Sequence, residues 1–216
     1  MHVVSINRGQ RERLDHRSFS GVTGIFKRPV QGPVPIGQLG LELDAVVNGK
    51  HHGGPDQAVY IYRQEDYDWW SAELGRPVEP GTFGDNLTLA GLPDAGAVIG
   101  SRLDFGTVVL EITAPRIPCN TLAARMGDPG FVKRFLAAER PGLYCRVIRA
   151  GPLHTGASFI CTPYEGDPVS TLDIFRARYR RLTGTELRRF LAAPIDERTR
   201  IGYQRDLAGR DPARPD

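Results

Sequence analysis

The stretch TVVLEITAPRIPCNTLAARM, residues 107–126, joins an apolar run to a helix-forming run through a turn that holds a single cysteine. The apolar and β-branched part, 107–114, is typical of a strand, and 119–126 predicts a short helix. Between them, two prolines and an arginine precede Cys119. A structural cysteine usually packs within an apolar run, as a small hydrophobic residue. The constrained position of Cys119 therefore raises the question of a chemical role.

Short strands recur on both sides of this stretch, separated by turns rich in glycine and proline. The chain of 216 residues contains 25 Gly and 17 Pro, which cluster between the short apolar runs. The strands are predicted at residues 2–7, 22–27, 58–62, 86–91, 101–106, 107–114, 142–148 and 157–161. Short helices are predicted at residues 63–74, 119–126 and 129–138. This pattern favours a mainly β fold, a sandwich or a closed barrel, with inserted short helices.

The character of the sequence changes after residue 162, where helical patterns replace strands. Ser170 and Asp173 have the spacing of a capping box. An apolar stripe at helical spacing is formed by Leu172, Phe175, Tyr179 and Leu182. Two further short helices are predicted at 185–193 and 194–207. We therefore predict a β domain at 1–162, an appended three-helix unit at 163–208 and a flexible tail at 209–216.

Composition and charge argue against several classes of protein. With 40% hydrophobic and 25% charged residues, the chain is typical of a soluble globular protein. The formal net charge is only +3, so the concentrated positive field of a nucleic-acid-binding protein is missing. The sequence has no run of 18 apolar residues, and its three cysteines form no CxxC pair. We expect a cytoplasmic protein that binds neither a membrane nor a nucleic acid.

The turn around Cys119 combines two features that lower the pKa of a thiol. If Pro118 opens the helix, the thiol lies in its first turn, where free N–H groups and the helix dipole favour an anion. Arg116 adds positive charge, and the thiolate is the form that attacks a substrate or ligates a metal. The alternative is a small residue that fits a crowded, proline-bounded turn. The residues alone leave both interpretations open.

Three further stretches hold polar residues at turns or strand ends. In KHHGGPDQAVYIY, His52 and Asp56 flank a glycine turn whose N–H groups can bind an anion. In TFGDNLTLAG, Asn86 offers both a donor and an acceptor at the start of a strand. Lys27, one of three lysines in the chain, closes an earlier strand. Each stretch taken alone also fits a surface turn, an Asx turn or a strand-end charge, and decides nothing.

Taken in order, these motifs resemble the MOSC domain, which is named after the C-terminal domain of molybdenum cofactor sulfurase. The motifs are GIFKRPV, GLELD, HGGPDQAVYIY, FGDNLT, PRIPC and GLYCRVI, and the likeness runs over residues 2–162. Together with the three-helix unit, it indicates the stand-alone bacterial, YiiM-type members. Two positions depart from the family pattern, because Leu43 in GLELD replaces a glycine and GDN stands where GEN is common.

The resemblance implies a closed β-barrel that holds the molybdenum cofactor, a phosphate-bearing pyranopterin with dithiolene-bound molybdenum. It implies that Cys119 ligates the metal. The other residues that match family positions, and would line the cofactor pocket, are Lys27, His52, Asp56, Asn86 and Arg116. A thiolate suits molybdenum as a ligand, and cations and backbone donors suit the phosphate group.

The resemblance also implies an oxidoreductase that reduces N-hydroxylated compounds, such as N-hydroxylated purines, with Cys119 and Arg116 as catalytic residues. Electrons would come from a separate donor protein, because the sequence has neither a ferredoxin-type cysteine cluster nor a flavin fingerprint. One alternative is a carrier of persulfide sulfur, or of the cofactor, that uses the same cysteine. Another is a non-catalytic barrel that stores the cofactor or binds nucleic acid. The helical unit has two candidate docking surfaces, its own barrel and a second chain in a homodimer.

Overall fold

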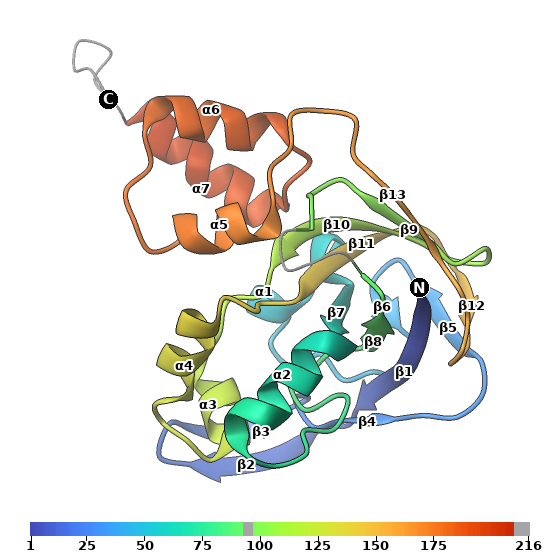
Figure 1. Cartoon of the computed structure of the whole chain (residues 1–216). Coiled ribbons are helices and arrows are strands. Elements are labelled where there is room, and N and C mark those ends of the chain that lie inside the picture. Colours follow the sequence, from blue (N-terminus) through green and yellow to red (C-terminus); the bar gives the residue numbers. More distant parts are fainter. Residues whose placement is uncertain (93–96, 210–216) are drawn as a thin grey trace.

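An eight-stranded mixed sheet forms the centre of the chain, whose computed structural model describes residues 1–92 and 97–209 except for the side chains of Lys50 and His51 (Figure 1). Its strands are β1 (His2–Gly9), β4 (Lys27–Pro29), β7 (Val59–Arg63), β8 (Leu87–Ala90), β9 (Arg102–Asp104), β10 (Val109–Pro115), β11 (Leu143–Arg149) and β13 (Ile160–Thr162). The order is β13-β9-β10-β11-β7-β8-β1-β4, and the β7–β8 pair is parallel while the others are antiparallel.

Two smaller sheets flank the main one. The first contains β5 (Val34–Gly37), β6 (Gly40–Leu41) and β12 (Gly151–Leu153), and the second is the hairpin of β2 (Glu12–His16) and β3 (Phe19–Thr23). Apolar side chains of the first small sheet share one core with those of the main sheet; the buried members include Val34, Ile36, Leu153, Ile6 and Leu110.

The predicted closure into a barrel is not shown by the strand pairing. Within residues 1–92 and 97–209, β4 and β13 are edge strands of the main sheet, and each bonds to one neighbour. Short strands and glycine turns have the same sequence pattern in an open, curved sheet as in a barrel, because closure depends on strand tilt and register. The fold is a mixed α/β arrangement around this sheet.

The strand predicted at 22–27 is divided in the structure. Thr23 ends β3 and Lys27 begins β4, so the chain turns between them. Gly24 permits this turn, since a Cβ atom there would lie 1.9 Å from the carbonyl oxygen of Ala45. The apolar residues of this stretch also fit one continuous strand, so the local sequence does not predict the turn.

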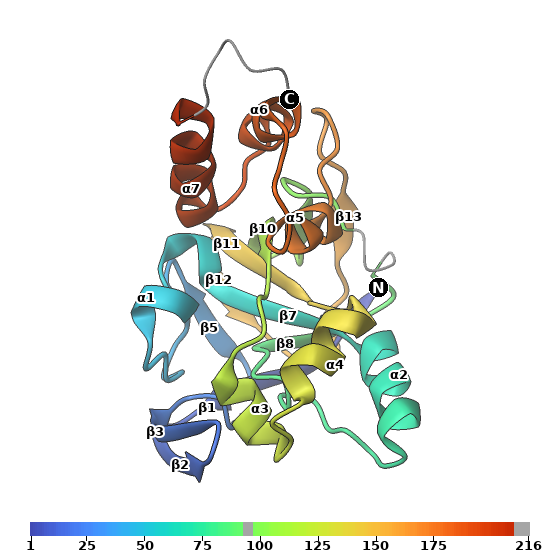
Figure 2. The ribbon, with the colours of Figure 1, turned by 90° about the vertical axis from the view of Figure 1, so that its left-hand side faces the viewer.

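Helices cover the lower part of the sheet, as Figures 1 and 2 show. They are α2 (Gln64–Leu74), α3 (Asn120–Met126) and α4 (Phe131–Ala138), close to the predicted ranges. Trp70 of α2 is 1% exposed and stacks on Phe135 of α4 at 6.0 Å between ring centroids. This aromatic core also contains Phe83 and Phe131. Trp70 therefore acts as a core residue, and α3, which follows Cys119, rests against a rigid support.

The C-terminal segment forms α5 (Thr171–Ala177), α6 (Gly184–Ala192) and α7 (Glu197–Ala208), which lie above the main sheet in Figure 1. The capping box of Ser170 and Asp173 is present. Helix α5 ends at Ala177, however, so the predicted stripe is interrupted and Tyr179 is 53% exposed. The buried residues Ile174, Leu187 and Phe190 belong to the same core as the sheet. The division at residue 163 stays a prediction, and residues 210–216 of the predicted tail lie outside the described residues.

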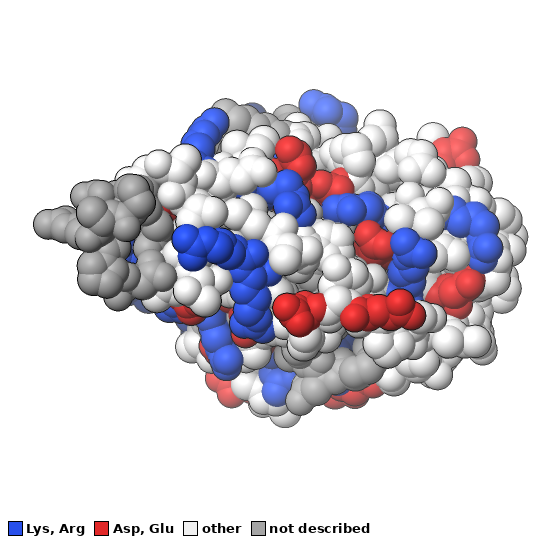
Figure 3. All heavy atoms as spheres, turned by 90° about the horizontal axis from the view of Figure 1, so that it is seen from above, with Lys and Arg blue, Asp and Glu red and all other residues white. Residues whose placement is uncertain are grey.

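The described surface seen in Figure 3, which includes the C-terminal helices, carries basic and acidic side chains interspersed with one another. Several arginines pair locally with carboxylates, for example Arg180 with Glu186 at 2.6 Å. Within residues 1–92 and 97–209, no helix has both the length and the apolar character needed to cross a bilayer.

The unequal burial of the predicted stripe in the C-terminal segment gives a test. Phe175→Ala should lower the free energy of unfolding by about 3–5 kcal/mol, because it removes a ring that is 2% exposed. Tyr179→Ala, the matched control, should cost less than about 1 kcal/mol. Urea denaturation of both variants measures the difference. Equal losses would show that α5 does not pack as described.

Candidate functional site

A cavity of about 540 Å³ opens between β4, the β7–β8 pair and the turn after β10, and we call it the inner cavity. Six cofactor-binding residues were proposed from the sequence, and five of them line this cavity: Lys27, His52, Asn86, Arg116 and Cys119. They come from separate parts of the chain, which the sheet brings together. Gly84, at φ +77°, lines the cavity, and a Cβ atom at this position would lie 3.3 Å from Nη1 of Arg116.

Arg116 is a buried cation in the turn after β10, and its residue is 4% exposed. Its Nη1 donates a hydrogen bond of 2.7 Å to the carbonyl oxygen of Phe83. Its guanidinium carbon lies 5.0 Å from the centroid of the Tyr60 ring. The Nε atom is buried and has no hydrogen-bond partner among the described residues. A buried guanidinium with a free donor is a strong attractor for an anion.

The thiol of Cys119 lies next to this cation. Cys119 is the N-cap residue of α3, and its carbonyl oxygen accepts hydrogen bonds from the N–H groups of Leu122 and Ala123. Burial alone would raise the pKa of this thiol, but a hydrogen bond from His52, the charge of Arg116 and the N–H of Leu122 outweigh burial and lower the pKa to about 6. As the N-cap residue, Cys119 lies one residue before the first turn of α3. Because its pKa is about 6, its thiol is ionised at neutral pH.

The other two cysteines have the opposite electrostatic setting. Burial raises the pKa of Cys145, which is fully enclosed in β11, and burial also raises the pKa of Cys161 in β13. All three cysteines are free thiols. Cys119 therefore differs from the other cysteines in its electrostatics as well as in its sequence context.

His52 ends the short helix α1 (Gly49–His52), beside the glycine turn predicted from the sequence. Its Nδ1 lies 3.2 Å from the hydroxyl of Tyr144 on β11. The C-terminal segment holds this turn from outside, because Arg198 of α7 donates hydrogen bonds to the carbonyl oxygens of Gly49 and Gly53. The position of His52, and through it the ionisation of Cys119, thus depends on a helix far along the chain.

Asp44, which was not proposed from the sequence, contacts two of the residues that line the inner cavity. Its carboxylate forms an ion pair with Lys27, and both side chains are less than a tenth exposed. Asn86 donates from Nδ2 to Asp44 at 2.8 Å, while its Oδ1 accepts from the N–H of Tyr60 at 3.1 Å. Burial lowers the pKa of Lys27, and the charge of Asp44 opposes that effect. Lys27 and Asn86 are therefore held by Asp44 at the wall of the inner cavity.

The departure at Leu43 does not remove the bend of this loop. Leu43 has φ +62°, a left-handed conformation that favours glycine, and its side chain is 80% exposed. The loop keeps a glycine-like backbone next to Asp44. Asp44 at the end of GLELD, rather than the replaced glycine, was the sequence signal for a partner of Lys27 and Asn86.

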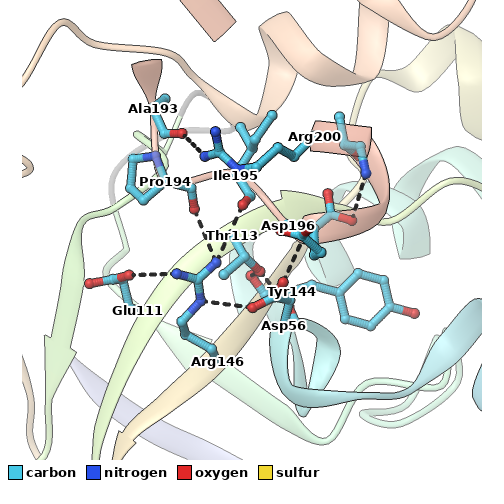
Figure 4. A network of polar contacts seen from close by, with 12 residues as sticks. Asp56, Glu111, Thr113, Tyr144, Arg146, Ala193, Pro194, Ile195, Asp196 and Arg200 are labelled. Carbon is cyan, nitrogen blue, oxygen red and sulfur yellow. Dashed lines mark hydrogen bonds and ion pairs between the residues drawn. The ribbon is translucent and has the colours of Figure 1, made fainter. Parts of the chain in front are cut away.

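Asp56, the sixth proposed residue, does not line the inner cavity. It lies in the short 3₁₀ helix η1 (Pro55–Gln57), and its carboxylate is turned toward β11 and the C-terminal segment (Figure 4). Its Oδ1 pairs with Nε of Arg146 at 2.9 Å, and its Oδ2 accepts from the N–H of Glu197 at 2.8 Å. Asp56 therefore lies apart from the other five proposed residues, and its carboxylate oxygens join α7 to the sheet.

A second hollow of about 580 Å³ adjoins the first, and we call it the outer hollow. Its walls include residues of α5 and α7, and it shares Cys119, His52 and Tyr144 with the inner cavity. The thiol thus stands where the two spaces meet. The C-terminal segment supplies one side of the outer hollow, although no site residue was predicted there from the sequence.

The residues of the inner cavity fit a group that brings most of its own metal ligands. Among the described residues, no three His, Cys, Asp or Glu side chains are grouped as a metal site. Cys119 offers one thiolate, a ligand for a soft metal, and Arg116 offers a free buried donor for an anionic or oxo group. A bound dithiolene cofactor would supply the remaining ligands.

Comparison with known proteins identifies the family. The MOSC domain family matches residues 48–159, more than half of the chain. The chain therefore belongs to the MOSC domain family, which is associated with the molybdenum cofactor. The MOSC motifs proposed from the sequence, including HGGPD and PRIPC, lie within or next to the inner cavity.

Relatives and solved structures extend this likeness. The Bacillus subtilis protein named Uncharacterized protein YflK is 35% identical over 156 residues, covering 72% of this chain and 71% of that protein. A Gibberella moniliformis protein named Reductase is 32% identical over 157 residues, which are 70% of this chain but only 26% of that protein. The crystal structure of YiiM from Geobacillus stearothermophilus covers 95% of this chain and 98% of its own, with a TM-score of 0.78 and 27% identity. For YiiM from Escherichia coli the TM-score is 0.72 at 25% identity, with 89% and 94% coverage.

The low pKa of Cys119 predicts how this thiol reacts. In metal-free protein, its alkylation by iodoacetamide should rise through pH 6 and level off near neutral pH, because the thiolate is then fully formed. His52→Gln should move the midpoint toward the value of an ordinary thiol, about 8.5. Mass spectrometry of timed reactions gives the rate at each cysteine, with Cys145 as the unreactive control. A midpoint above pH 8 for wild-type Cys119 would contradict this electrostatic assignment.

The buried pair of Lys27 and Asp44 predicts energetic coupling. Asp44→Asn should lower the free energy of unfolding by about 3–5 kcal/mol, because it leaves a buried cation without its counter-charge. The double variant with Lys27→Met should lose less than the sum of the two single losses. Urea denaturation of the four proteins of this cycle measures the coupling, and strictly additive losses would show that the pair is not formed.

Proposed function

We propose that this protein is a molybdenum-cofactor-dependent reductase of N-hydroxylated compounds. The observation that carries the proposal is the Cys119 thiol, which has a pKa of about 6 and stands where the inner cavity meets the outer hollow. A ligand fixed by this thiolate in the inner cavity faces the outer hollow, through which a substrate can approach. The name Reductase, which the Gibberella protein carries, supports a redox role.

In this proposal each residue of the inner cavity has a physical task. Cys119 would bind the metal as a thiolate, and Arg116 would keep that thiolate ionised. The free Nε of Arg116 would hold an anionic oxygen of the cofactor. His52 is fixed between Cys119 and the hydroxyl of Tyr144, where its ring can pass a proton. When bound, the cofactor would supply two-electron transfer.

The reaction balances with an external source of electrons. An N–O bond breaks, two electrons and two protons are consumed, and the products are the amine or imine and water. We propose that the electrons come from a separate iron–sulfur or flavin protein, because the sequence carries no fingerprint for such a group. The mixed charges of the surface in Figure 3 offer contacts of both signs to such a donor.

The same thiolate favours one other function, that of a persulfide carrier. Cys119 is a low-pKa thiol without other metal-ligating side chains grouped around it in the described part of the chain. A thiolate of this kind can attack the outer sulfur of a donor persulfide, which releases the donor's thiolate and leaves a persulfide on Cys119. The two functions differ in what the purified protein contains, molybdenum or an extra sulfur atom.

Metal analysis of cysteine variants tests the proposal. The full chain from a molybdenum-replete host should contain molybdenum and pterin and should reduce N-hydroxylated adenine with a chemical electron donor. Cys119→Ser should lose at least about nine-tenths of the metal and activity, because the metal loses its protein thiolate. Cys145→Ser, the matched control, should keep both, since Cys145 is buried outside the cavity.

Two results of this experiment contradict the proposal. Equal molybdenum content in Cys119→Ser and wild type would show that the thiol is not the ligand. A wild-type protein that lacks molybdenum but carries one additional sulfur atom on Cys119, by mass, would identify the persulfide carrier instead.

A further inference from the structure

The carboxylate of Asp196 is buried and only half satisfied. Asp196 is the N-cap residue of α7 and is 3% exposed. Its Oδ1 accepts a hydrogen bond of 3.2 Å from the N–H of Thr199, whereas its Oδ2 is buried without a hydrogen-bond partner in the described part of the chain. An unpartnered carboxylate oxygen costs free energy in a folded protein. The hollow that Asp196 lines has room for a partner from outside the chain.

Asp196 lines the outer hollow together with Cys119 and His52. The same hollow has apolar and aromatic walls, to which Ile117, Ile174 and Tyr203 contribute. Exposed charges belong to its lining as well, among them Arg178 and Asp206. A flat ring with a polar edge matches such a space, because its faces contact the apolar walls and its edge meets the buried carboxylate.

The position of Asp196 is imposed by contacts with the sheet. The N–H of Asp196 donates to the carbonyl oxygen of Thr113 on β10 at 3.2 Å. Arg146 of β11 donates to the carbonyl oxygens of Pro194 and Ile195, just before Asp196, at 3.3 and 3.4 Å. Figure 4 shows this linker against the two strands. The carboxylate is therefore held in place before any ligand arrives, as a specific binding group must be.

Charge at this position favours a hydrogen-bond donor over an anion. Burial raises the pKa of Asp196, and the nearby carboxylate of Asp56 raises it further, while Thr199 and the charge of Arg198 oppose them. Arg198 is already engaged with Gln57 and with two carbonyl oxygens of the glycine turn. An N–H group of a ligand would complete the coordination of Oδ2 without adding negative charge to the site.

We propose that the outer hollow is the substrate pocket, and that Oδ2 of Asp196 accepts a hydrogen bond from an N–H group of a planar nitrogen heterocycle. This inference rests on the proposed reductase function for the identity of the reacting group, which faces Cys119. The C-terminal helices then supply substrate recognition, whereas the sheet supplies the cofactor site. Compounds without an N–H donor at the recognised edge bind more weakly.

The test measures binding, so its result does not depend on turnover. Calorimetry of the full chain is carried out with adenine, 9-methyladenine and purine, which differ in their ring and exocyclic N–H donors. In wild type, removal of the recognised donor should weaken binding about ten- to a hundredfold. In Asp196→Asn that penalty should vanish and adenine should bind correspondingly less tightly, because an amide NH2 group, which donates, takes the place of Oδ2, which accepts. Asparagine is as good an N-cap residue as aspartate, so α7 should keep its stability.

Asp173→Asn is the matched control, because it makes the same change in the first turn of α5, outside both cavities. It should leave the affinity and the ligand preference of wild type unchanged. A wild type that binds none of the three ligands, or an Asp196→Asn variant that retains the same donor preference, overturns the inference.

The two proposals can fail separately. Reduction of N-hydroxylated adenine by Asp196→Asn with an unchanged KM would remove Asp196 from the pocket and leave the reductase function intact. Binding that depends on Asp196, in a metal-loaded protein that reduces no N-hydroxylated compound, would keep the pocket and reject the function.

Discussion

A buried guanidinium organises the site of this protein. Arg116 follows β10 at a turn between two prolines, and its side chain is 4% exposed beneath the inner cavity. A cation in such a place needs compensation, which it receives from the carbonyl of Phe83, the face of the Tyr60 ring and the thiolate of Cys119. The charge that stabilises the turn is therefore also the charge that ionises the thiol. The hydrogen bond from His52 adds to this charge, so the low pKa of Cys119 depends on both side chains.

A second group of arginines makes the C-terminal segment part of the site. Arg146 joins β11 to Asp56, to Glu111 and to the linker before α7 (Figure 4). Arg198 joins α7 to the glycine turn that carries His52. The contacts of Arg198 connect residues that lie 149 and 145 positions apart in the chain. The segment after residue 163 thus does more than cover the sheet. It fixes the turn that tunes Cys119 and forms one wall of the outer hollow.

Local sequence was sufficient for features that depend on nearby residues. The strand before Pro115, the helix after Cys119 and the capping box at Ser170 are all present, because each rests on periodicity or on a pair a few residues apart. The motif order identified the family, and it placed five of six proposed residues in one cavity.

Features that depend on distant partners were not visible in the sequence. Asp44 contacts Lys27, 17 positions away, and Asn86, 42 positions away, and neither contact can be read from the local sequence. Asp56 was proposed because it flanks the glycine turn and matches a family position, but its oxygens contact Arg146 and Glu197. The sequence also could not show whether the main sheet closes into a barrel, since closure depends on strand register around the whole sheet.

The central claim is that Cys119 is a metal ligand, held ready as a thiolate by Arg116 and His52. X-ray absorption at the molybdenum edge tests it most directly, on the full chain purified from a molybdenum-replete host. Our account predicts one sulfur ligand beyond those of the dithiolene, at the distance of a metal–thiolate bond. A spectrum that contains only dithiolene sulfur, with oxygen in the remaining positions, would contradict it.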